Sequence, residues 1–275
     1  KGDEYITNIM PLPENQDEWD NLNIMFATAK GNIRRSDLLD FKKIQSNGKI
    51  AIRIDEDDKL IDVKPCKEDE HILLATKSGK AVRFPVESLR VIKSRTSDGV
   101  RGMRLAEDDS VISMTVLKGI KATREERDAY LSVSWEKRLE IAKGEEFNSE
   151  ELGVDLTAES ILEMANSEEF ILTVTENGFG KRSSAYGYRI TDRGGSGIIN
   201  MDINDKTGLV VGVMPVKMDD ELMLITNSGK LIRCKLETVR ITGRNTSGVT
   251  LFRLDDGEKV VSASLITESS DDNEE

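Results

Sequence analysis

The sequence contains few of the residues from which catalytic and metal sites are usually built. Among 275 residues there are two cysteines, one histidine and 5% aromatic residues. Cys66 and Cys234 are far apart and have no partner pattern, which is typical of reduced thiols in a cytosolic protein. Any His-based metal site or Ser-His-Asp triad would depend on His71 alone, and its place at the start of the strand-like run HILLAT favours a structural role.

Membrane-spanning, targeting and catalytic motifs are also missing. No apolar run approaches the ~18 residues of a membrane span. The start, KGDEYITNIM, lacks the pattern of a signal peptide and an initial Met, which indicates a fragment or a processed chain. NGFGKRSS at 177–184 resembles a nucleotide-binding loop, but Arg182 stands where the Walker pattern needs Ser or Thr. Without an HExxH, GxSxG or Cys/His cluster, we expect no independent catalysis, metal or cofactor.

Charge is distributed unevenly along the chain, whose net charge is −12. Residues 1–22, 121–169 and 268–275 carry −5, −8 and −5, so that 23–120 and 170–267 together carry +6. The acidic residues are therefore concentrated in appendages, and the mildly basic body is compatible with a polyanionic partner.

An internal repeat organises this body. Four segments align as an apolar run, a turn with glycine and a short strand: IMFATAKGNIRR from 24, ILLATKSGKAVR from 72, ILTVTENGFGKR from 171 and LMLITNSGKLIR from 222. The first turn glycines are Gly31, Gly79, Gly178 and Gly229. The second set, Gly48, Gly99, Gly197 and Gly248, follows 17, 20, 19 and 19 residues later. The start, DEYITNIMPL, matches the closing element of a further unit.

Each unit is predicted to form about four short strands, because its apolar runs are β-branched and bounded by Gly, Asn, Ser and Asp. A period of about fifty residues with four strands is typical of a propeller blade, and stacked neighbours supply the core that one sheet lacks. We therefore expect an all-β, propeller-like array of four-stranded blades. A solenoid of hairpins is the structural alternative.

Residues 121–169 interrupt the repeat with a helical pattern. Thr123 and Glu126 form a capping-box sequence, and Thr157 is the candidate cap of a second helix. Apolar positions recur at helical spacing at Tyr130, Leu131, Val133, Trp135, Leu139 and Ala142. We expect an inserted helical hairpin in which Tyr130 and Trp135 pack. The expected organisation is the end of a preceding repeat and a linker at 1–22, two blades at 23–120, the acidic insertion at 121–169, two blades at 170–267 and an acidic disordered tail at 268–275.

Basic residues recur at equivalent places in the units. The first set flanks the turn glycines: Lys30, Arg34, Arg35, Lys77, Lys80, Arg83, Lys181, Arg182, Lys230, Arg233 and Lys235. The second set lies further along: Lys42, Lys43, Lys49, Arg90, Lys93, Arg95, Arg101, Arg189, Arg193, Arg240 and Arg244. In a radial array these positions would form a basic belt along one rim, which predicts contacts with the phosphates of DNA or RNA. Solvated turn charges paired with acids are the alternative interpretation.

Several motifs in order resemble the C-terminal domain of bacterial DNA gyrase A: GVRGMRL (99–105), ENGFGKR (176–182), GLVVGVMPV (208–216) and GRNTSGV (243–249). The resemblance covers nearly all of 1–267 apart from the insertion, and GRNTSGV favours gyrase over the homologous domain of topoisomerase IV. It implies a β-pinwheel, in which neighbouring blades exchange strands, and a chain that matches the last four of six blades.

The resemblance also implies a function. Such a domain binds double-stranded DNA around its basic edge and bends it, which guides DNA to the cleavage core of a type II topoisomerase for negative supercoiling. The implied partners are the gyrase A dimer and gyrase B, which hydrolyses ATP, in the bacterial cytoplasm with the nucleoid. The chain is expected to bind DNA without cutting it, because its tyrosines, Tyr5, Tyr130, Tyr186 and Tyr188, lie in repeat or insertion context. A protein-interaction module that binds a partner through the acidic insertion is the alternative function.

The family's wrapping heptad, Q(R/K)RGG(R/K)G, does not occur here. Its nearest match is TDRGGSG, with Asp192 and Ser196 where the heptad has basic residues. We interpret this stretch as a weakened DNA contact in which Arg193 reaches a phosphate and the glycines allow close approach. The tail, 268–275, is expected to compete with DNA for the basic edge. A belt of backbone contacts reads charge and deformability, so sequence-specific recognition is not expected.

Overall fold

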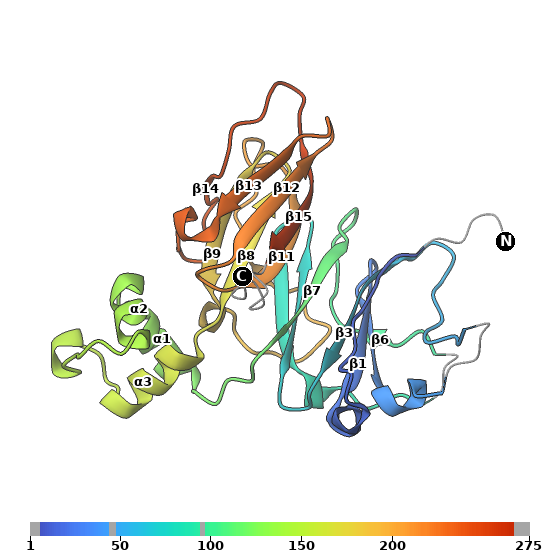
Figure 1. The fold of residues 1–275 in the computed structure, drawn as a ribbon, viewed down its shortest axis with the longest axis horizontal. Helices are drawn as coiled ribbons and strands as arrows, with labels where there is room; N and C mark the ends of the chain where they lie inside the picture. Colours follow the sequence, from blue (N-terminus) through green and yellow to red (C-terminus); the bar gives the residue numbers. More distant parts are fainter. Residues whose placement is uncertain (1–5, 44–47, 94–96, 267–275) are drawn as a thin grey trace, which may run out of the picture. The chain divides into compact units, whose positions relative to one another are not determined.

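The computed structural model describes residues 6–43, 48–93 and 97–266, which form two compact units (Figure 1). One unit comprises the chain up to Gly119 together with Ile190–Asn200. The other comprises Ile120–Arg189 and the chain from Met201 onwards. Each unit contains two antiparallel sheets, so that the four sheets follow the four sequence repeats.

The first unit is built around the hairpins of the first two repeats. Its first sheet has the order β3 (Leu60–Cys66), β1 (Asn23–Thr28), β2 (Asn32–Asp37), β6 (Val100–Arg101). Its second sheet has the order β10 (Ile198–Ile199), β5 (Lys80–Pro85), β4 (His71–Thr76), β7 (Val111–Leu117). Three short 3-10 helices belong to this unit: η1 (Gln16–Asn21), η2 (Leu38–Phe41) and η3 (Val86–Ser88).

The second unit repeats this plan. Its first sheet has the order β11 (Val210–Val216), β8 (Phe170–Thr175), β9 (Phe179–Ser184), β14 (Val249–Thr250). Its second sheet has the order β13 (Leu231–Lys235), β12 (Glu221–Thr226), β15 (Val260–Ile266). The 3-10 helices η5 (Ala185–Gly187) and η6 (Leu236–Thr238) follow the hairpins, as η2 and η3 do in the first unit.

Neighbouring repeats exchange a strand. β6, β10 and β14 each come from the repeat that follows the sheet they join, and each pairs antiparallel with the second strand of the preceding hairpin. Ile33 of β2, for example, pairs with Val100 of β6. This exchange confirms the all-β, propeller-like β-pinwheel that the sequence predicts. Among the described residues the fourth sheet has three strands, and β13 forms its edge.

The first strand of each hairpin supplies much of the core. β4, HILLAT, and β8, FILTVT, are buried at all six positions, because both faces of each strand are covered. Leu74 and Phe84 lie in the core of the first unit, and Leu172 and Leu224 lie in that of the second. The cores are therefore largely aliphatic, as the composition predicts.

Glycine permits the chain to cross from one repeat into the sheet of another. Gly248 has a φ of +73°, and a Cβ there would lie 2.6 Å from the carbonyl oxygen of Gly180. Gly197, with a φ of +75°, has the same relation to the carbonyl oxygen of Ala81, also at 2.6 Å. All eight repeat glycines have a positive φ, the left-handed region in which a side chain is strained. At Gly197 and Gly248, any residue with a Cβ would therefore be disfavoured both by the positive φ and by the nearby carbonyl oxygen.

The insertion forms three helices, α1 (Arg124–Ser132), α2 (Trp135–Ala142) and α3 (Ala158–Ser167), with η4 (Glu150–Leu152) between the last two. Thr123 caps α1 with the expected capping box, and Thr157 caps α3. The expected first helix is divided, because the chain becomes extended at Val133 and Ser134 then accepts a hydrogen bond from the amide of Lys137. A serine in this role satisfies a free amide of a new first turn, so it starts a second helix.

Tyr130 and Trp135 of the insertion pack, as expected. Tyr130 is fully buried and lies edge-on against Tyr186, with ring centroids 5.6 Å apart. Its hydroxyl donates to Glu168, which also forms a 3.2 Å ion pair with the buried Arg138. Trp135 packs against the core of β8 and β12.

Candidate nucleic-acid interface

The segments that lead from a 3-10 helix to an exchanged strand form a repeated surface. We call residues 90–101, 189–199 and 240–250 the exchange loops, and 42–50 is their counterpart in the first repeat. The exchanged strand lies at one edge of its sheet, whereas the strands at the opposite edges contact each other, β3 with β7 and β11 with β15. The exchange loops therefore run along the outer edges of the sheets.

Basic side chains occupy equivalent places in these loops. Arg90, Arg189 and Arg240 each follow the residue that ends a 3-10 helix, and all three are exposed. The other predicted residues on these segments are the exposed Lys42, Lys43, Lys93, Arg101 and Arg193 and the partly buried Lys49 and Arg244. Arg95 lies outside the described residues, as does the tail 268–275. The described residues of the second set thus lie on equivalent outer loops of their repeats.

The glycine-rich loop at 190–197 is bonded through its backbone to the segment that follows the exchanged strand β6. The amide of Gly194 donates to the carbonyl oxygen of Gly102 at 2.6 Å, and the amide of Arg104 donates to that of Gly195 at 2.9 Å. The exposed guanidinium of Arg193 donates to the carbonyl oxygen of Arg101 at 3.3 Å. Arg193 and Arg101, from two different repeats, therefore share one surface.

Five residues of the first set are not on the surface. Arg34, Arg35, Arg83, Lys181 and Arg182 are each no more than 4% exposed. They lie on β2, β5 and β9, which the exchanged strands cover on their outer side. A cation enclosed in this way and bonded to protein acceptors does not reach a phosphate, so the prediction of DNA contacts is corrected for these five residues.

Arg35 and Arg182 join neighbouring repeats instead. Nη1 of Arg35 donates to the carbonyl oxygen of Leu89 at 2.9 Å, and Nε of Arg182 donates to that of Val239 at 2.8 Å. Leu89 and Val239 both end the 3-10 helix of the following repeat. Burial lowers the pKa of the Arg182 guanidinium, and the carbonyl dipoles take the place of the lost hydration.

Arg34 holds an exchange loop from beneath. Its Nη1 donates to the carbonyl oxygen of Ser97 at 2.9 Å and its Nη2 to that of Ile92 at 3.2 Å. Both acceptors belong to the loop that carries Arg90 and Lys93. The buried cation is therefore part of the scaffold under the exposed ones.

Lys181 has the same role in the second unit. Its Nζ donates to the carbonyl oxygens of Gly243 at 3.0 Å and Thr246 at 2.9 Å, and also to that of Arg244. Burial, together with the charge of Arg244, lowers the pKa of the Lys181 amine to about 7. The three carbonyl acceptors favour the protonated amine and so oppose this shift.

Arg83 and the single histidine form a structural pair. Nε of Arg83 donates to Nδ1 of His71 at 3.1 Å, and its Nη2 donates to the carbonyl oxygen of Lys118 at 2.8 Å. Because a guanidinium only donates, Nδ1 of His71 accepts and carries no proton in this pair. His71 is buried, in keeping with the structural role expected from its strand.

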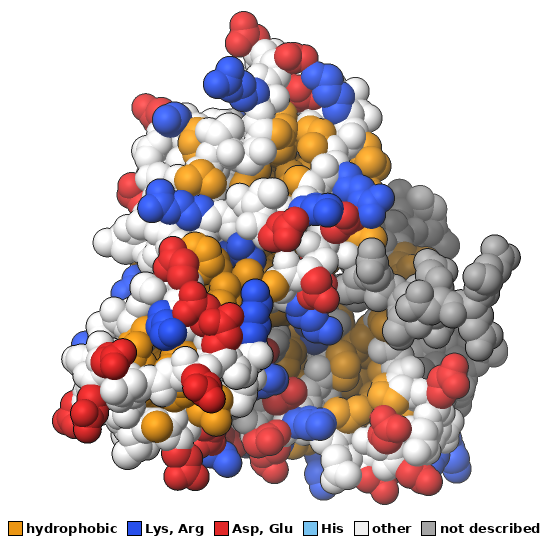
Figure 2. All heavy atoms as spheres, turned by 60° about the vertical axis from the view of Figure 1, so that its left-hand side comes forward, with side chains coloured by type: hydrophobic (Ala, Val, Ile, Leu, Met, Phe, Trp, Pro, Cys, Tyr) orange, Lys and Arg blue, Asp and Glu red, His pale blue; other side chains and the backbone are white. Residues whose placement is uncertain are grey.

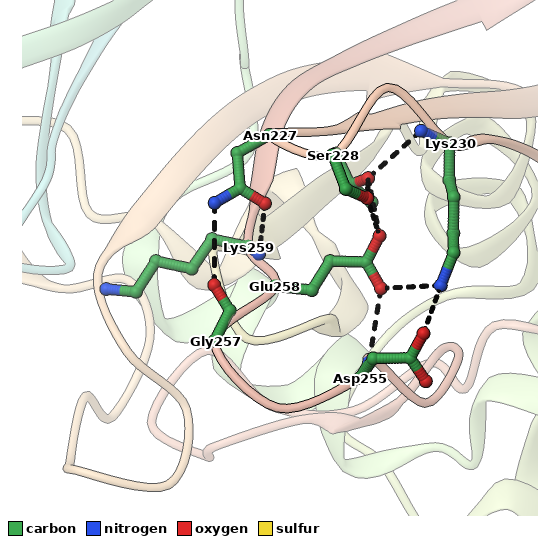
Figure 3. Close-up of polar contacts among 8 residues, drawn as sticks. Asn227, Ser228, Lys230, Asp255, Gly257, Glu258 and Lys259 are labelled. Carbon is green, nitrogen blue, oxygen red and sulfur yellow. Dashed lines mark hydrogen bonds and ion pairs between the residues drawn. The ribbon is translucent and has the colours of Figure 1, made fainter.

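Cations at the hairpin turns are exposed but paired with acids. Lys30 forms an ion pair with Asp57. Lys230 contacts Asp255 at 2.5 Å and Glu258 at 3.0 Å within the polar network of Figure 3. Exposed pairs of this kind contribute little stability, but each carboxylate repels a phosphate that approaches the same cation. The alternative interpretation, solvated turn charges, therefore suits these residues.

The rest of the first set is on the surface as well. Lys80, Arg233 and Lys235 are exposed, Lys77 is partly buried, and Arg233 pairs with Glu221. On the face shown in Figure 2, basic and acidic side chains are interspersed rather than gathered into one continuous basic area. Phosphate contacts would therefore be discrete.

Within the repeats, the predicted contacts omit three exposed arginines, Arg53, Arg104 and Arg253. Each stands five residues after the second glycine of its repeat, so this regular spacing could have identified all three as equivalent positions. Arg104 and Arg101 line a pocket together with Lys30, at the end of the hairpin of the first repeat. Arg104 thus extends the basic surface around β6.

Metal-binding and membrane-spanning features are not found in the part of the chain that the structure describes. No group of three or more His, Cys, Asp or Glu side chains there is arranged to hold a metal ion. No helix within 6–43, 48–93 and 97–266 has the length and apolar character needed to cross a membrane.

Strand-exchanged blades with basic outer loops define a propeller-type domain. The family model described as "DNA gyrase C-terminal domain, beta-propeller" matches residues 22–67, 70–118, 169–217 and 220–267. The chain therefore belongs to the family of DNA gyrase C-terminal domains.

Curated relatives agree with this assignment. The chain is 98% identical over 275 residues to DNA gyrase A of Rickettsia bellii, covering 100% of this chain and 30% of the relative. It is 46% identical to DNA gyrase A of Granulibacter bethesdensis, covering 99% of this chain and 31% of the relative. For DNA gyrase A of Salmonella typhimurium the identity is 31%, covering 100% of this chain and 25% of the relative. The chain thus spans between a quarter and a third of the length of these relatives.

Solved structures support the fold. A structure of the DNA gyrase A C-terminal domain matches with a TM-score of 0.65 and 24% identity, covering 90% of this chain and 67% of that chain. The C-terminal domain of DNA topoisomerase IV matches with a TM-score of 0.66 and 16% identity, covering 90% of this chain and 62% of that chain.

Proposed function

We propose that this chain is a non-catalytic domain that binds duplex DNA along its exchange loops and bends or wraps it. The observation that carries the proposal is the equivalence of Arg90, Arg189 and Arg240, which are exposed at the same position of three successive repeats. Cations repeated along outer loops attract a regular polyanion whatever its sequence, because the gain comes from counterion release at phosphates. Contacts of this kind position the duplex without reading its bases.

Within a whole gyrase, the domain would guide DNA to the cleavage core for negative supercoiling. The partners in this proposal are a second gyrase A chain and gyrase B, which hydrolyses ATP, in the bacterial cytoplasm. Membership of the gyrase family and the 98% identity to a DNA gyrase A support it. No cofactor is proposed for this part of the protein.

Ligation of nicked circular DNA in the presence of increasing protein tests the proposal. Wrapping fixes a protein-dependent change in linking number, which is measured after the protein is removed. The matched control carries Arg90→Gln, Arg189→Gln and Arg240→Gln, which should weaken binding without disturbing the core. A gel shift without a linking change would restrict the function to DNA binding, and the absence of both would refute it.

A further inference from the structure

The exchange loop of the last repeat depends on one buried side chain. Between η6 and β14 its backbone does not form a continuous ladder, so its carbonyl groups need other donors. Nζ of Lys181 donates to the carbonyl oxygens of Gly243 and Thr246, at 3.0 and 2.9 Å, to that of Arg244, and to Oγ1 of Thr246 at 3.2 Å. One Nζ, with at most three N–H groups, thus lies within hydrogen-bond distance of four acceptors from residues 243–246.

In the first unit, Arg34 bonds the exchange loop of the following repeat in the same way as Lys181 does in the second. Arg34 and Lys181 both stand three residues after the turn glycine of their repeat. Their acceptors Ser97 and Thr246 both stand two residues before the second glycine. Because a guanidinium in one unit and an amine in the other bond the same loop position, the shared feature is a buried side chain with several N–H donors rather than one particular residue type.

The two other repeats have an apolar residue at this position. Val82 stands at the corresponding position of the second repeat, and the following loop is held by backbone bonds through Gly194 and Gly195. Ile232 stands at the corresponding position of the fourth repeat, where no exchanged strand pairs with β13 in the described chain. The buried donor adds side-chain bonds to two loops whose carbonyl oxygens, at Ser97 and Thr246, also accept from the backbone amides of Arg53 and Asp202.

We propose that Arg34 and Lys181 are positioning residues for DNA binding, each fixing the exchange loop of the following repeat so that its exposed arginines meet phosphates. The proposal rests on the function proposed above. Arg244 illustrates it, because its carbonyl oxygen accepts from Lys181 while its Nε donates to the carbonyl oxygen of Gly187 at 2.9 Å. Neither buried cation contacts DNA itself.

The dependence of DNA affinity on salt separates positioning from direct contact. Each phosphate contact contributes about 0.9 to the slope of log affinity against log salt. Lys181→Met should lower affinity several-fold at every salt concentration and leave the slope unchanged. Arg240→Gln should instead make the slope shallower by about 0.9. Lys181→Arg introduces the group that Arg34 provides in the first unit, so it should restore affinity. Hydrogen exchange should quicken at amides 243–247 in Lys181→Met and stay slow in β12.

A milder variant keeps the proposal testable if Lys181→Met does not fold. Thr246→Val removes one acceptor of Lys181 and should weaken affinity in the same direction with an unchanged slope. An unchanged affinity in a folded Lys181→Met, or a slope lowered by about one phosphate, would overturn the proposal. Loss of DNA binding by the unaltered chain would instead refute the proposed function, so the two failures are distinguishable.

Discussion

Nε of Arg182 lies 2.8 Å from the carbonyl oxygen of Val239, and this hydrogen bond joins two repeats through a buried cation. The guanidinium also donates to the carbonyl oxygen of Glu237 at 3.4 Å. Because these acceptors belong to the 3-10 helix of the next repeat, the contact fixes where the exchange loop begins. Arg182, whose repeated position in the sequence predicted a DNA contact, thus connects two neighbouring blades.

Replacing this residue should destabilise the fold. Arg182→Met is expected to lower the free energy of unfolding by about 3 kcal/mol, because buried carbonyl groups lose their donor. Arg233→Met is the matched control, since Arg233 has the same repeat position but a side chain that is 59% exposed, and its effect should stay within about 0.5 kcal/mol. Urea unfolding measures the stability of both variants, and equal losses of unfolding free energy would contradict the structural role of Arg182.

The same sequence pattern occurs in two environments, which limits what sequence alone can predict. The repeat period and its glycines are visible in the sequence, and they predict the strands, turns and blade class. The burial of Arg182 is not visible, because the backbone that lies against it forms a parallel bridge at Ile241, far along the chain. In β13 the equivalent Arg233 stays exposed, since no strand covers that edge within the described residues. Strand exchange, a long-range contact, therefore decides which basic residues are available to DNA.

Replacing Gly248 should lower the free energy of unfolding by more than backbone strain alone would. Gly248→Ala would place a Cβ 2.6 Å from the carbonyl oxygen of Gly180 at a φ of +73°. Gly48 has a similar φ of +79°, and no atom of the described residues lies within 4 Å of the added Cβ, so Gly48→Ala is the control for strain. We expect a loss of about 3 kcal/mol for Gly248→Ala and about 1 kcal/mol for Gly48→Ala in thermal or urea unfolding. Similar losses would show that the carbonyl moves aside.

Lys181 should make stability depend on pH. Its pKa is lowered from its ordinary 10.5 to about 7 by burial, so between these values the unfolded chain binds a proton that the folded chain does not. Stability should therefore rise with pH above 7, by at most about 1.4 kcal/mol per unit. Lys181→Met removes this contribution, and the difference between the two unfolding curves should grow from pH 7 to 9. A difference that stays flat would show that the carbonyl acceptors keep the amine protonated.

The two cysteines should differ in reactivity. Cys66 is 1% exposed, and burial raises the pKa of its thiol to about 12. Cys234 is only partly buried, on the edge strand β13, although burial raises the pKa of its thiol too. Since the thiolate reacts, alkylation followed by mass spectrometry should label Cys234 at least about tenfold faster. Equal rates in the native protein, rather than only in urea, would contradict the buried position of Cys66.

The two sets of exposed cations should differ in their effect on DNA binding. Arg90→Gln, Arg189→Gln and Arg240→Gln together remove one cation from each exchange loop, so the salt slope should fall by about 2.7, which is three phosphate contacts. Lys30→Gln and Lys230→Gln remove cations that face Asp57 and Asp255, and because these acids already repel phosphates the slope should fall by less than about 0.9. Titrations of one duplex at several salt concentrations measure both variants. If the Lys30→Gln, Lys230→Gln variant showed the greater reduction in salt dependence, DNA would contact the hairpin turns rather than the exchange loops.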